Sequence, residues 1–270
     1  MKEFLIRTAS GLTYAALMIG SITIHPLIFG VVFLLILIKG MTEFYSFTTD
    51  PDQKPMVIPG IAAGILVFLS FFLYRYASLD RSIFLIIPFT GLLLFIITIF
   101  RKQGQPINSL ALTLLGIIYV AVPLSLFNGL VYHPYLEGFN YQVGLFLFVI
   151  IWLNDTGAYI TGMLIGKHKM FTRISPKKTW EGLAGGLFFA FLASWLMRPV
   201  IPDIPDNQAW MLTLAIVISG TFGDLAESAF KRAAGVKDSG KFMPGHGGLL
   251  DRFDSLLFAA PIVYLLINLF

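Results

Sequence analysis

Apolar runs of membrane-spanning length recur from one end of this 270-residue chain to the other. A helix that crosses a bilayer needs about 20 predominantly apolar residues, because the hydrocarbon core has no water to bind backbone groups. Only 13% of the residues are charged, whereas an ordinary soluble domain carries about 25%. The sequence therefore predicts an all-α polytopic integral membrane protein with about nine transmembrane helices. They lie near residues 8–24, 26–38, 57–74, 82–100, 107–131, 142–161, 182–198, 208–224 and 254–270.

The second apolar run is short, and Pro26 separates it from the first. A tight or re-entrant hairpin of these two runs is the alternative to two full spans, so the predicted range is seven to nine. No A-x-A-like site follows the first run, so we expect no cleaved signal peptide. The chain has no cysteine, which excludes disulfides, thiolate metal ligands and cysteine nucleophiles.

Basic residues predict the orientation of the chain. With the N-terminus in the cytoplasm, nine spans place 16 basic residues in cytoplasmic segments and 3 in outside segments, namely Arg75, Arg81 and Arg198. The positive-inside rule thus predicts a cytoplasmic N-terminus and a C-terminus outside. Membrane insertion alone explains this split, and the modest net charge of +4 does not indicate a nucleic-acid partner.

Two long polar loops, 162–181 and 225–253, are predicted on the cytoplasmic side. They carry ten basic residues between them, so they can form one surface that attracts anions. We therefore expect residues 1–135 to form a lipid-side bundle of transmembrane helices. Residues 136–270 would form the catalytic half, which carries both loops.

An acid interrupts the apolar run GLFLFVIIWLNDTGAYITG. Asp155 lies four residues before Tyr159, so both would share one helix face. A carboxylate inside a span is costly and is by default a candidate functional residue. Solvation at the membrane interface is the alternative interpretation of Asp155.

Further acids gather near the C-terminus, at Asp224, Asp238, Asp251 and Asp254. Helix capping explains one acid at a helix start, but unpaired carboxylates near lipid repel one another. A divalent cation removes this repulsion, and Mg²⁺ commonly shares carboxylate oxygens with substrate phosphates. If the helix that ends the run at Asp224 continues past the membrane, one face carries Asp224, Glu227, Ser228 and Lys231.

Glycines accompany these acids in the stretch KDSGKFMPGHGGLLDRFDS. Gly240, Gly245, Gly247 and Gly248 permit close approach of backbone N–H groups to an anion. His246 is a candidate general acid, a phosphate donor or a spectator. In the other loop, Lys177 and Lys178 suit a phosphate or phospholipid headgroup.

The stretch from residue 228 to 255 resembles the signature of the CTP:phosphatidate cytidylyltransferases, also called CDP-diacylglycerol synthases. That signature reads S-x-x-K-R-x4-K-D, a glycine linker, then P-x-H-G-G-x-x-D-R-x-D. Its positions are filled by Ser228, Lys231, Arg232, Lys237, Asp238, Pro244, His246, Gly247, Gly248, Asp251, Arg252 and Asp254. NDTGAYITG and ISPKKTWEG are also similar to the family, whereas the N-terminal half matches only as apolar helices.

The resemblance implies that CTP and phosphatidate react to give CDP-diacylglycerol and pyrophosphate, with Mg²⁺ required and a second cation possible. It also implies a homodimer in a bacterial-type inner membrane, with a cytoplasmic active site. The implied catalytic residues are Asp224, Lys237, Asp238, His246 and Asp251. The implied metal ligands are Asp224, Asp251, Asp254 and Asp155. The implied substrate-binding residues are Ser175, Lys177, Lys178, Glu181, Ser228, Lys231, Arg232, Gly247, Gly248 and Arg252.

Two other classes remain open at this point. A CDP-alcohol phosphotransferase would also act on a membrane lipid phosphate with a metal, but its D-G-x2-A-R pattern is absent, since NDTGAY lacks the arginine. An ion transporter would place charges at mid-span on several helices. Here the charges are predicted to gather at one membrane face, which favours surface chemistry.

Overall fold

The computed structural model describes residues 2–49, 54–102, 105–132, 139–240, 242 and 247–269, with side chains from residue 9 onward. The long elements of the first half are α1 (Lys2–Thr23), α2 (Pro26–Thr48), α3 (Val57–Tyr76), α4 (Ile86–Ile99), α5 (Pro106–Gly116) and α6 (Val122–Val131). Those of the second half are α7 (Gln142–Ile165), α8 (Trp180–Leu196), α9 (Asp206–Ala233) and α10 (Asp254–Leu269). Three short turns complete the helices: η1 (Arg81–Leu85), η2 (Ile117–Ala121) and η3 (Leu250–Arg252).

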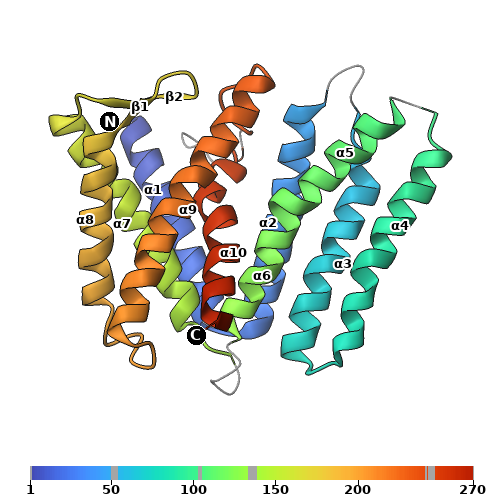
Figure 1. The fold of residues 1–270 in the computed structure, drawn as a ribbon, viewed down its shortest axis with the longest axis horizontal. Helices are drawn as coiled ribbons and strands as arrows, with labels where there is room; N and C mark the ends of the chain where they lie inside the picture. The colour runs from blue at the N-terminus through green and yellow to red at the C-terminus, as the bar shows by residue number, and fades with distance from the viewer. Residues whose placement is uncertain are drawn as a thin grey trace.

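Most helices run along a common direction and form a bundle (Figure 1). Within the described residues, 6 helical stretches are long and apolar enough to cross a membrane. Three apolar helices are shorter, at Ala9–Thr23, Trp180–Leu196 and Asp254–Leu269. Each of these stretches coincides with one of the apolar runs in the sequence, so the prediction of a helical membrane protein is confirmed. The number of spans remains a prediction.

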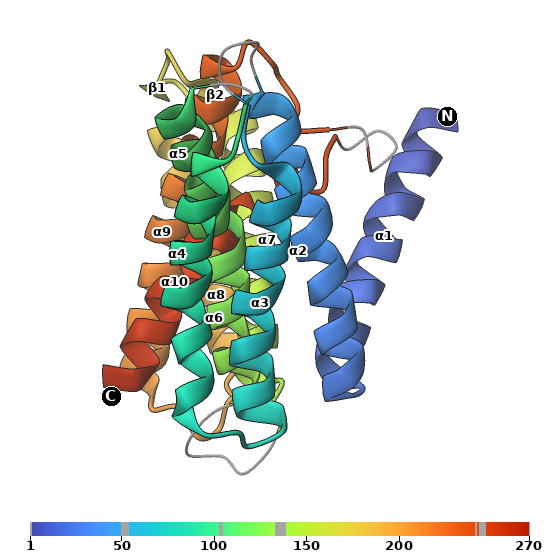
Figure 2. The ribbon, with the colours of Figure 1, turned by 90° about the vertical axis from the view of Figure 1, so that its right-hand side faces the viewer.

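The segments predicted to face the cytoplasm lie at one end of the bundle. The start of α1 and the segment between α7 and α8 lie at this end, and the end of α10 lies at the opposite end (Figures 1 and 2). The turn that joins α3 to η1 and the one that joins α8 to α9 also lie at the opposite end. The long polar loops therefore meet on one side of the bundle, as the sequence predicted.

Helix α2 is longer than the apolar run that predicts it. The run ends at residue 38, whereas the helix continues to Thr48 and buries Met41, Glu43 and Phe44. Glu43, which follows the apolar run, is buried inside the protein and pairs at i,i+4 spacing with the partly exposed Lys39. A re-entrant hairpin is therefore not needed to explain this segment.

A π-helical turn interrupts the stretch from Pro106 to Val131. The N–H of Val122 bonds to the carbonyl of Ile117, one residue farther back than in an α-helix. Pro123 follows directly and has no N–H to donate. The wide turn therefore lies where the α-helical hydrogen-bond pattern is already interrupted. The turn buries Tyr119, whose ring packs edge-on against Phe230 at 5.3 Å.

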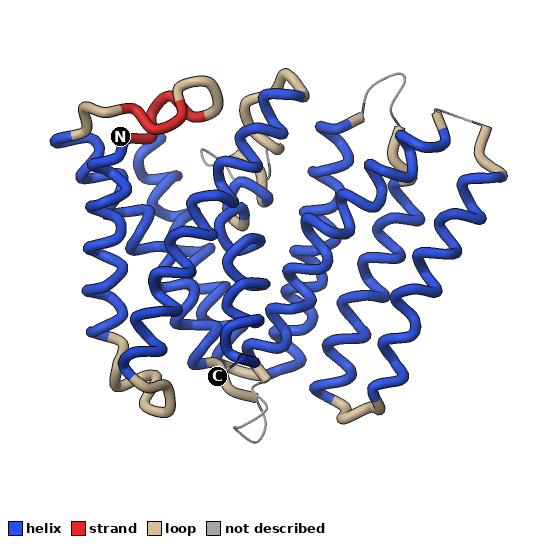
Figure 3. Tube along the Cα trace, viewed as in Figure 1, coloured by secondary structure: helices blue, strands red, loops and turns tan. Residues whose placement is uncertain are grey.

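A short hairpin, which the sequence did not predict, connects α7 to α8. Strands β1 (Lys169–Phe171) and β2 (Ser175–Thr179) pair antiparallel (Figure 3). The N–H of Trp180 bonds to the carbonyl of His168 at 3.0 Å, and the Thr179 hydroxyl accepts the N–H of Gly182 as the N-cap of α8. These bonds fix the hairpin over the end of the bundle.

Candidate active site

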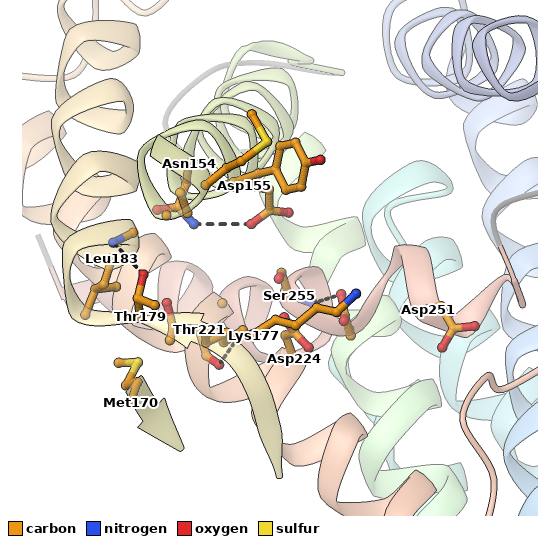
Figure 4. A pocket seen from close by; sticks show the side chains of 18 of the residues that line it. Asn154, Asp155, Met170, Lys177, Thr179, Leu183, Thr221, Asp224, Asp251 and Ser255 are labelled. Atoms are coloured by element: carbon orange, nitrogen blue, oxygen red, sulfur yellow. Dashed lines mark hydrogen bonds and ion pairs between the residues drawn. The ribbon is translucent and has the colours of Figure 1, made fainter. Parts of the chain in front are cut away.

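A pocket of ≈ 680 Å³ lies at the hairpin end of the bundle (Figure 4). It is formed by α7, the hairpin, the first turns of α8, the C-terminal half of α9, and the segment from η3 into α10. Its charged lining residues are Asp155, Lys169, Lys177, Lys178, Asp224, Lys231, Asp238, Asp251, Arg252 and Asp254. Ten charged residues therefore line one cavity, although only 13% of the chain is charged.

Three carboxylates enter the pocket from three different helices. Asp155 comes from α7, Asp224 from α9 and Asp254 from the first turn of α10. The charge of Asp224 repels those of both Asp155 and Asp254. Asn154 donates its amide to Asp155 at 3.3 Å, and the N–H of Ser255 donates to Asp254 at 2.7 Å. These bonds offset only part of the repulsion, so the pocket favours a bound cation.

The donor set fits Mg²⁺, which binds carboxylate oxygens. Within the described part of the chain, no three acidic or histidine side chains lie close enough to enclose a metal ion. Mg²⁺ commonly uses one or two protein carboxylates and completes its shell with water and substrate phosphates. An open set of carboxylates is therefore compatible with an ion that arrives together with a phosphorylated substrate.

A lysine from the hairpin pairs with one of these carboxylates. Nζ of Lys178 lies 2.7 Å from Oδ2 of Asp224 and 3.5 Å from the carbonyl oxygen of Thr221. Lys177, its neighbour, lines the same pocket and is exposed. The hairpin therefore brings one paired and one exposed cation to the cavity.

Asp251 binds the α9–η3 loop, residues 234–249, at two points. Its carboxylate accepts the N–H of Gly248 at 2.7 Å and that of Ser239 at 3.1 Å, and Oδ1 lies 2.6 Å from Nζ of Lys231. Burial acts to raise the pKa of Asp251, but Lys231 and the two N–H groups hold that pKa below its ordinary value. Gly247 adopts φ +86° beside it, a conformation that favours glycine. Figure 4 shows Asp251 set apart from Asp155 and Asp224.

Helix α9 continues to Ala233, so the predicted polar face forms. Ser228 donates its hydroxyl to Asp224 at 3.3 Å, and Lys231 lies 3.4 Å from Glu227 as well as near Asp251. Glu227 is fully buried. The spacing had placed Glu227 on this face, and the structure shows that it supports Lys231 from inside the bundle.

Several predicted catalytic and substrate-binding residues are not among the residues that line the pocket. They are Ser175, Glu181, Ser228, Arg232, Lys237, Gly247 and Gly248. Glu181 accepts the backbone N–H groups of Lys167 and His168 and contacts the His168 ring, so it fastens the hairpin to α8. Arg232 and Lys237 are exposed on the same end of the molecule. His246 lies outside the described residues.

Two contacts from the N-terminal half had not been predicted. Glu43 of α2 accepts the N–H of Leu250 at 2.9 Å, and the Tyr14 hydroxyl of α1 donates to the carbonyl of Arg252 at 3.3 Å. The cost of an acid inside an apolar helix would have singled out Glu43. It was missed because the apolar run was taken to end at residue 38.

Comparisons with known proteins point to one family. The model of the cytidylyltransferase family matches residues 5–270. The chain is 44% identical over 172 residues to a protein named phosphatidate cytidylyltransferase from Staphylococcus epidermidis. Proteins of the same name from Staphylococcus aureus and Staphylococcus saprophyticus are each 42% identical, over 173 and 172 residues. Each alignment covers 63% of this chain and 64% of the relative, which is less than two thirds of the relative's length.

Proposed function

Since the chain belongs to the cytidylyltransferase family, we propose that it is a phosphatidate cytidylyltransferase. It would transfer the cytidylyl group of CTP to phosphatidate and release pyrophosphate, which yields CDP-diacylglycerol. The names of the staphylococcal relatives support this choice of substrates.

The observation that carries the proposal is the composition of the pocket and its place in the fold. Asp155, Asp224 and Asp254 face Lys177 and Lys178 across one cavity, at the end of helices long enough to cross a membrane. A water-soluble triphosphate and a lipid phosphate can meet only at such a boundary. Both substrates are anions, so a cavity that joins them needs several cations.

The reaction is an in-line displacement at the α-phosphorus of CTP. A phosphate oxygen of phosphatidate forms the new bond to this phosphorus, and the bond to the bridging oxygen of pyrophosphate breaks. Phosphatidate is already ionised at neutral pH, so the reaction needs no strong general base. The protein's tasks are therefore to offset charge and to align the two substrates.

The cations divide between the two substrates in this proposal. Lys177 and Lys178 would hold the phosphate of phosphatidate, because they project from a hairpin at the predicted membrane surface. The triphosphate would be attracted by the basic residues at the end of α9 and just after it, namely Lys231, Arg232 and Lys237. For His246 we propose contact with a phosphate rather than proton abstraction.

Mg²⁺ would supply positive charge at the phosphate oxygens and at the departing pyrophosphate. Asp155, Asp224 and Asp254 face the pocket and would hold the ion. Asp251 also lines it, but would have to exchange Lys231 or a backbone N–H for the ion. We further propose nine spans in a bacterial inner membrane, with the pocket cytoplasmic, the C-terminus outside and two chains in a homodimer.

The test is an assay of the purified chain in detergent with CTP, dioleoyl phosphatidate and Mg²⁺. We expect CDP-diacylglycerol and pyrophosphate in equal amounts, and no product when dioleoylglycerol replaces phosphatidate. Formation of product from CDP-diacylglycerol and an alcohol, with release of CMP, would instead indicate a CDP-alcohol phosphotransferase. No turnover with either pair would overturn the proposal.

A further inference from the structure

Glu43 is a buried acid in the N-terminal half that binds the catalytic half. Its side chain is 4% exposed, and Oε2 accepts the N–H of Leu250 at 2.9 Å and the hydroxyl of Ser239 at 3.3 Å. These partners lie 207 and 196 residues away in sequence: Leu250 begins η3, and Ser239 lies within the α9–η3 loop. One carboxylate oxygen of α2 therefore binds both this loop and the helical turn that follows it.

Two glycines allow this approach. A Cβ at Gly240 would lie 2.8 Å from Oε1 of Glu43, and a Cβ at Gly248 would lie 2.7 Å from Oε2. Both distances are shorter than normal van der Waals contact. The glycines of this loop therefore serve Glu43 as well as any anion, because a side chain at either position would displace the carboxylate.

The loop is held from its other side by Asp251. Glu43 binds the hydroxyl of Ser239 while Asp251 binds the N–H of the same residue. Glu43 binds the N–H of Leu250, and Asp251 binds that of Gly248, two residues earlier. The two carboxylates thus share Ser239 as a partner and bind neighbouring backbone N–H groups, so a change at Glu43 is transmitted to Asp251 through Ser239.

Lys39 also pairs with Glu43, but this ion pair alone does not explain why the carboxylate is buried. Its Nζ lies 3.5 Å from Oε1 of Glu43 and 5.4 Å from the ring centroid of Phe242 in the same loop. A partly exposed i,i+4 ion pair contributes little and does not offset the burial of a carboxylate. The bonds to Ser239 and Leu250 provide the remaining stabilisation.

We propose that Glu43 is a positioning residue that holds Ser239 and the backbone of Leu250 in the conformation that binds the triphosphate of CTP. It does not touch the reacting atoms. It acts through Ser239 and Leu250, which adjoin Asp238 and Asp251 of the pocket. This role rests on the proposed function for its ligand, CTP, but the contact itself does not.

The test compares two replacements of similar size. In Glu43→Gln one carbonyl oxygen remains to accept the N–H of Leu250, whereas Glu43→Leu fills the same volume and accepts nothing. Lys39, the cation that loses its partner, is 40% exposed and can be solvated by water, so we expect both variants to fold. In full-length protein in detergent, Glu43→Leu should lower kcat/KM for CTP about tenfold or more, with KM for phosphatidate unchanged. Glu43→Gln should retain most of the wild-type kcat/KM.

Hydrogen exchange measures the contact independently of any activity. In Glu43→Leu, the amides of residues 247–252 should exchange at least tenfold faster than in wild type, with the β1–β2 hairpin unchanged. Asp80→Asn is the matched control, because Asp80 also accepts a backbone N–H, that of Ser82 at 2.8 Å, far from the pocket. Wild-type exchange in Glu43→Leu would overturn the inference. Faster exchange with an unchanged KM and kcat for CTP would overturn the positioning role. An inactive wild-type protein would refute the proposed function and leave the exchange test valid.

A double-mutant cycle adds a second test of the contact. Gly240→Ala alone should speed exchange in the same peptides, because its Cβ displaces Glu43. In a Glu43→Ala background the clashing atoms are gone, so Gly240→Ala should add less than twofold. Additive effects would show that the glycine and the glutamate act separately, against the inference.

Discussion

Lys178 of β2 and Asp224 of α9 form an ion pair, with 2.7 Å between Nζ and Oδ2, across the entrance of the pocket. The pair joins the hairpin to the helix that carries the predicted metal-binding acid. Both side chains are partly exposed, at 25% and 36%, so the pair itself contributes little to stability. Its importance is chemical, because an incoming phosphate competes with Asp224 for Lys178, and a cation competes with Lys178 for Asp224.

Asp224→Asn keeps the shape of the side chain and removes its charge. We expect a fall in kcat of about 100-fold or more, since the preorganised charge at the reacting phosphates is lost. Initial rates with CTP and phosphatidate at saturating Mg²⁺ measure this. Asp203→Asn, in the exposed turn between α8 and α9, is the control and should retain wild-type rate. Full activity in Asp224→Asn would show that Asp224 serves only to pair with Lys178.

Lys177→Ala and Lys178→Ala should affect different constants. Lys177 is exposed and has the freer side chain, so its loss should raise KM for phosphatidate about tenfold. Lys178→Ala should also lower kcat, because Asp224 loses its partner. The double variant should weaken phosphatidate use more than CTP use. Equal losses for both substrates would contradict this division.

Lys231→Met should destabilise the protein. It leaves Asp251 and Glu227 buried without their shared cation, and removing one partner of a buried pair costs about 3–5 kcal/mol. Thermal unfolding in detergent should show a clearly lower midpoint. Lys237→Met, at an exposed position of the loop that follows α9, controls for loss of charge and should unfold at the wild-type temperature. Equal midpoints in all three proteins would show that the buried pairs do not matter for stability.

Removal of Mg²⁺ by EDTA should abolish turnover, and added Mg²⁺ should restore it. Asp254→Asn and Asp155→Asn should each raise the Mg²⁺ concentration needed for half-maximal rate about tenfold, because each removes a carboxylate from the same pocket. Asp206→Asn, whose native carboxylate pairs with Arg198 at the other end of the bundle, should leave this concentration unchanged. Unchanged Mg²⁺ dependence in both pocket variants would exclude them as ligands.

The absence of cysteine makes the orientation directly measurable. A cysteine at Thr172, exposed in the hairpin, should react with an impermeant maleimide only after cells are opened. A cysteine at Asp203, exposed at the other end, should react in intact cells. Both sites are exposed, so burial does not confuse the comparison. Labelling of Thr172→Cys from outside would reverse the proposed orientation.

Helix positions were predictable because lipid requires long apolar runs, and charge asymmetry predicted which ends lie together. The same rule placed the end of α2 too early, since it reads Lys39 and Glu43 as membrane-exterior residues. The burial of Glu43 depends on Leu250 and Ser239, which no local pattern around residue 43 reveals. The β1–β2 hairpin was missed for a similar reason, because its strands are short and polar and are stabilised by the contacts of Glu181.

The residues of the pocket were largely predictable, whereas their pairing was not. Spacing along α9 placed Asp224 and Ser228 on one face, and the structure shows them bonded. Spacing along the sequence could not show that Lys178 pairs with Asp224 and Lys231 with Asp251, because these ion pairs join different segments.

The bond between Glu43 and Leu250 also sets an order of events during synthesis. Ribosomes complete α2 about two hundred residues before they make Leu250. The Glu43 carboxylate therefore enters the membrane long before the N–H group that donates to it exists. During that interval Lys39, one helical turn away, is the nearby cation that can neutralise it. The C-terminal half therefore supplies the hydrogen bonds of Glu43 only when it arrives, and a chain released before residue 250 lacks the N–H that this carboxylate accepts.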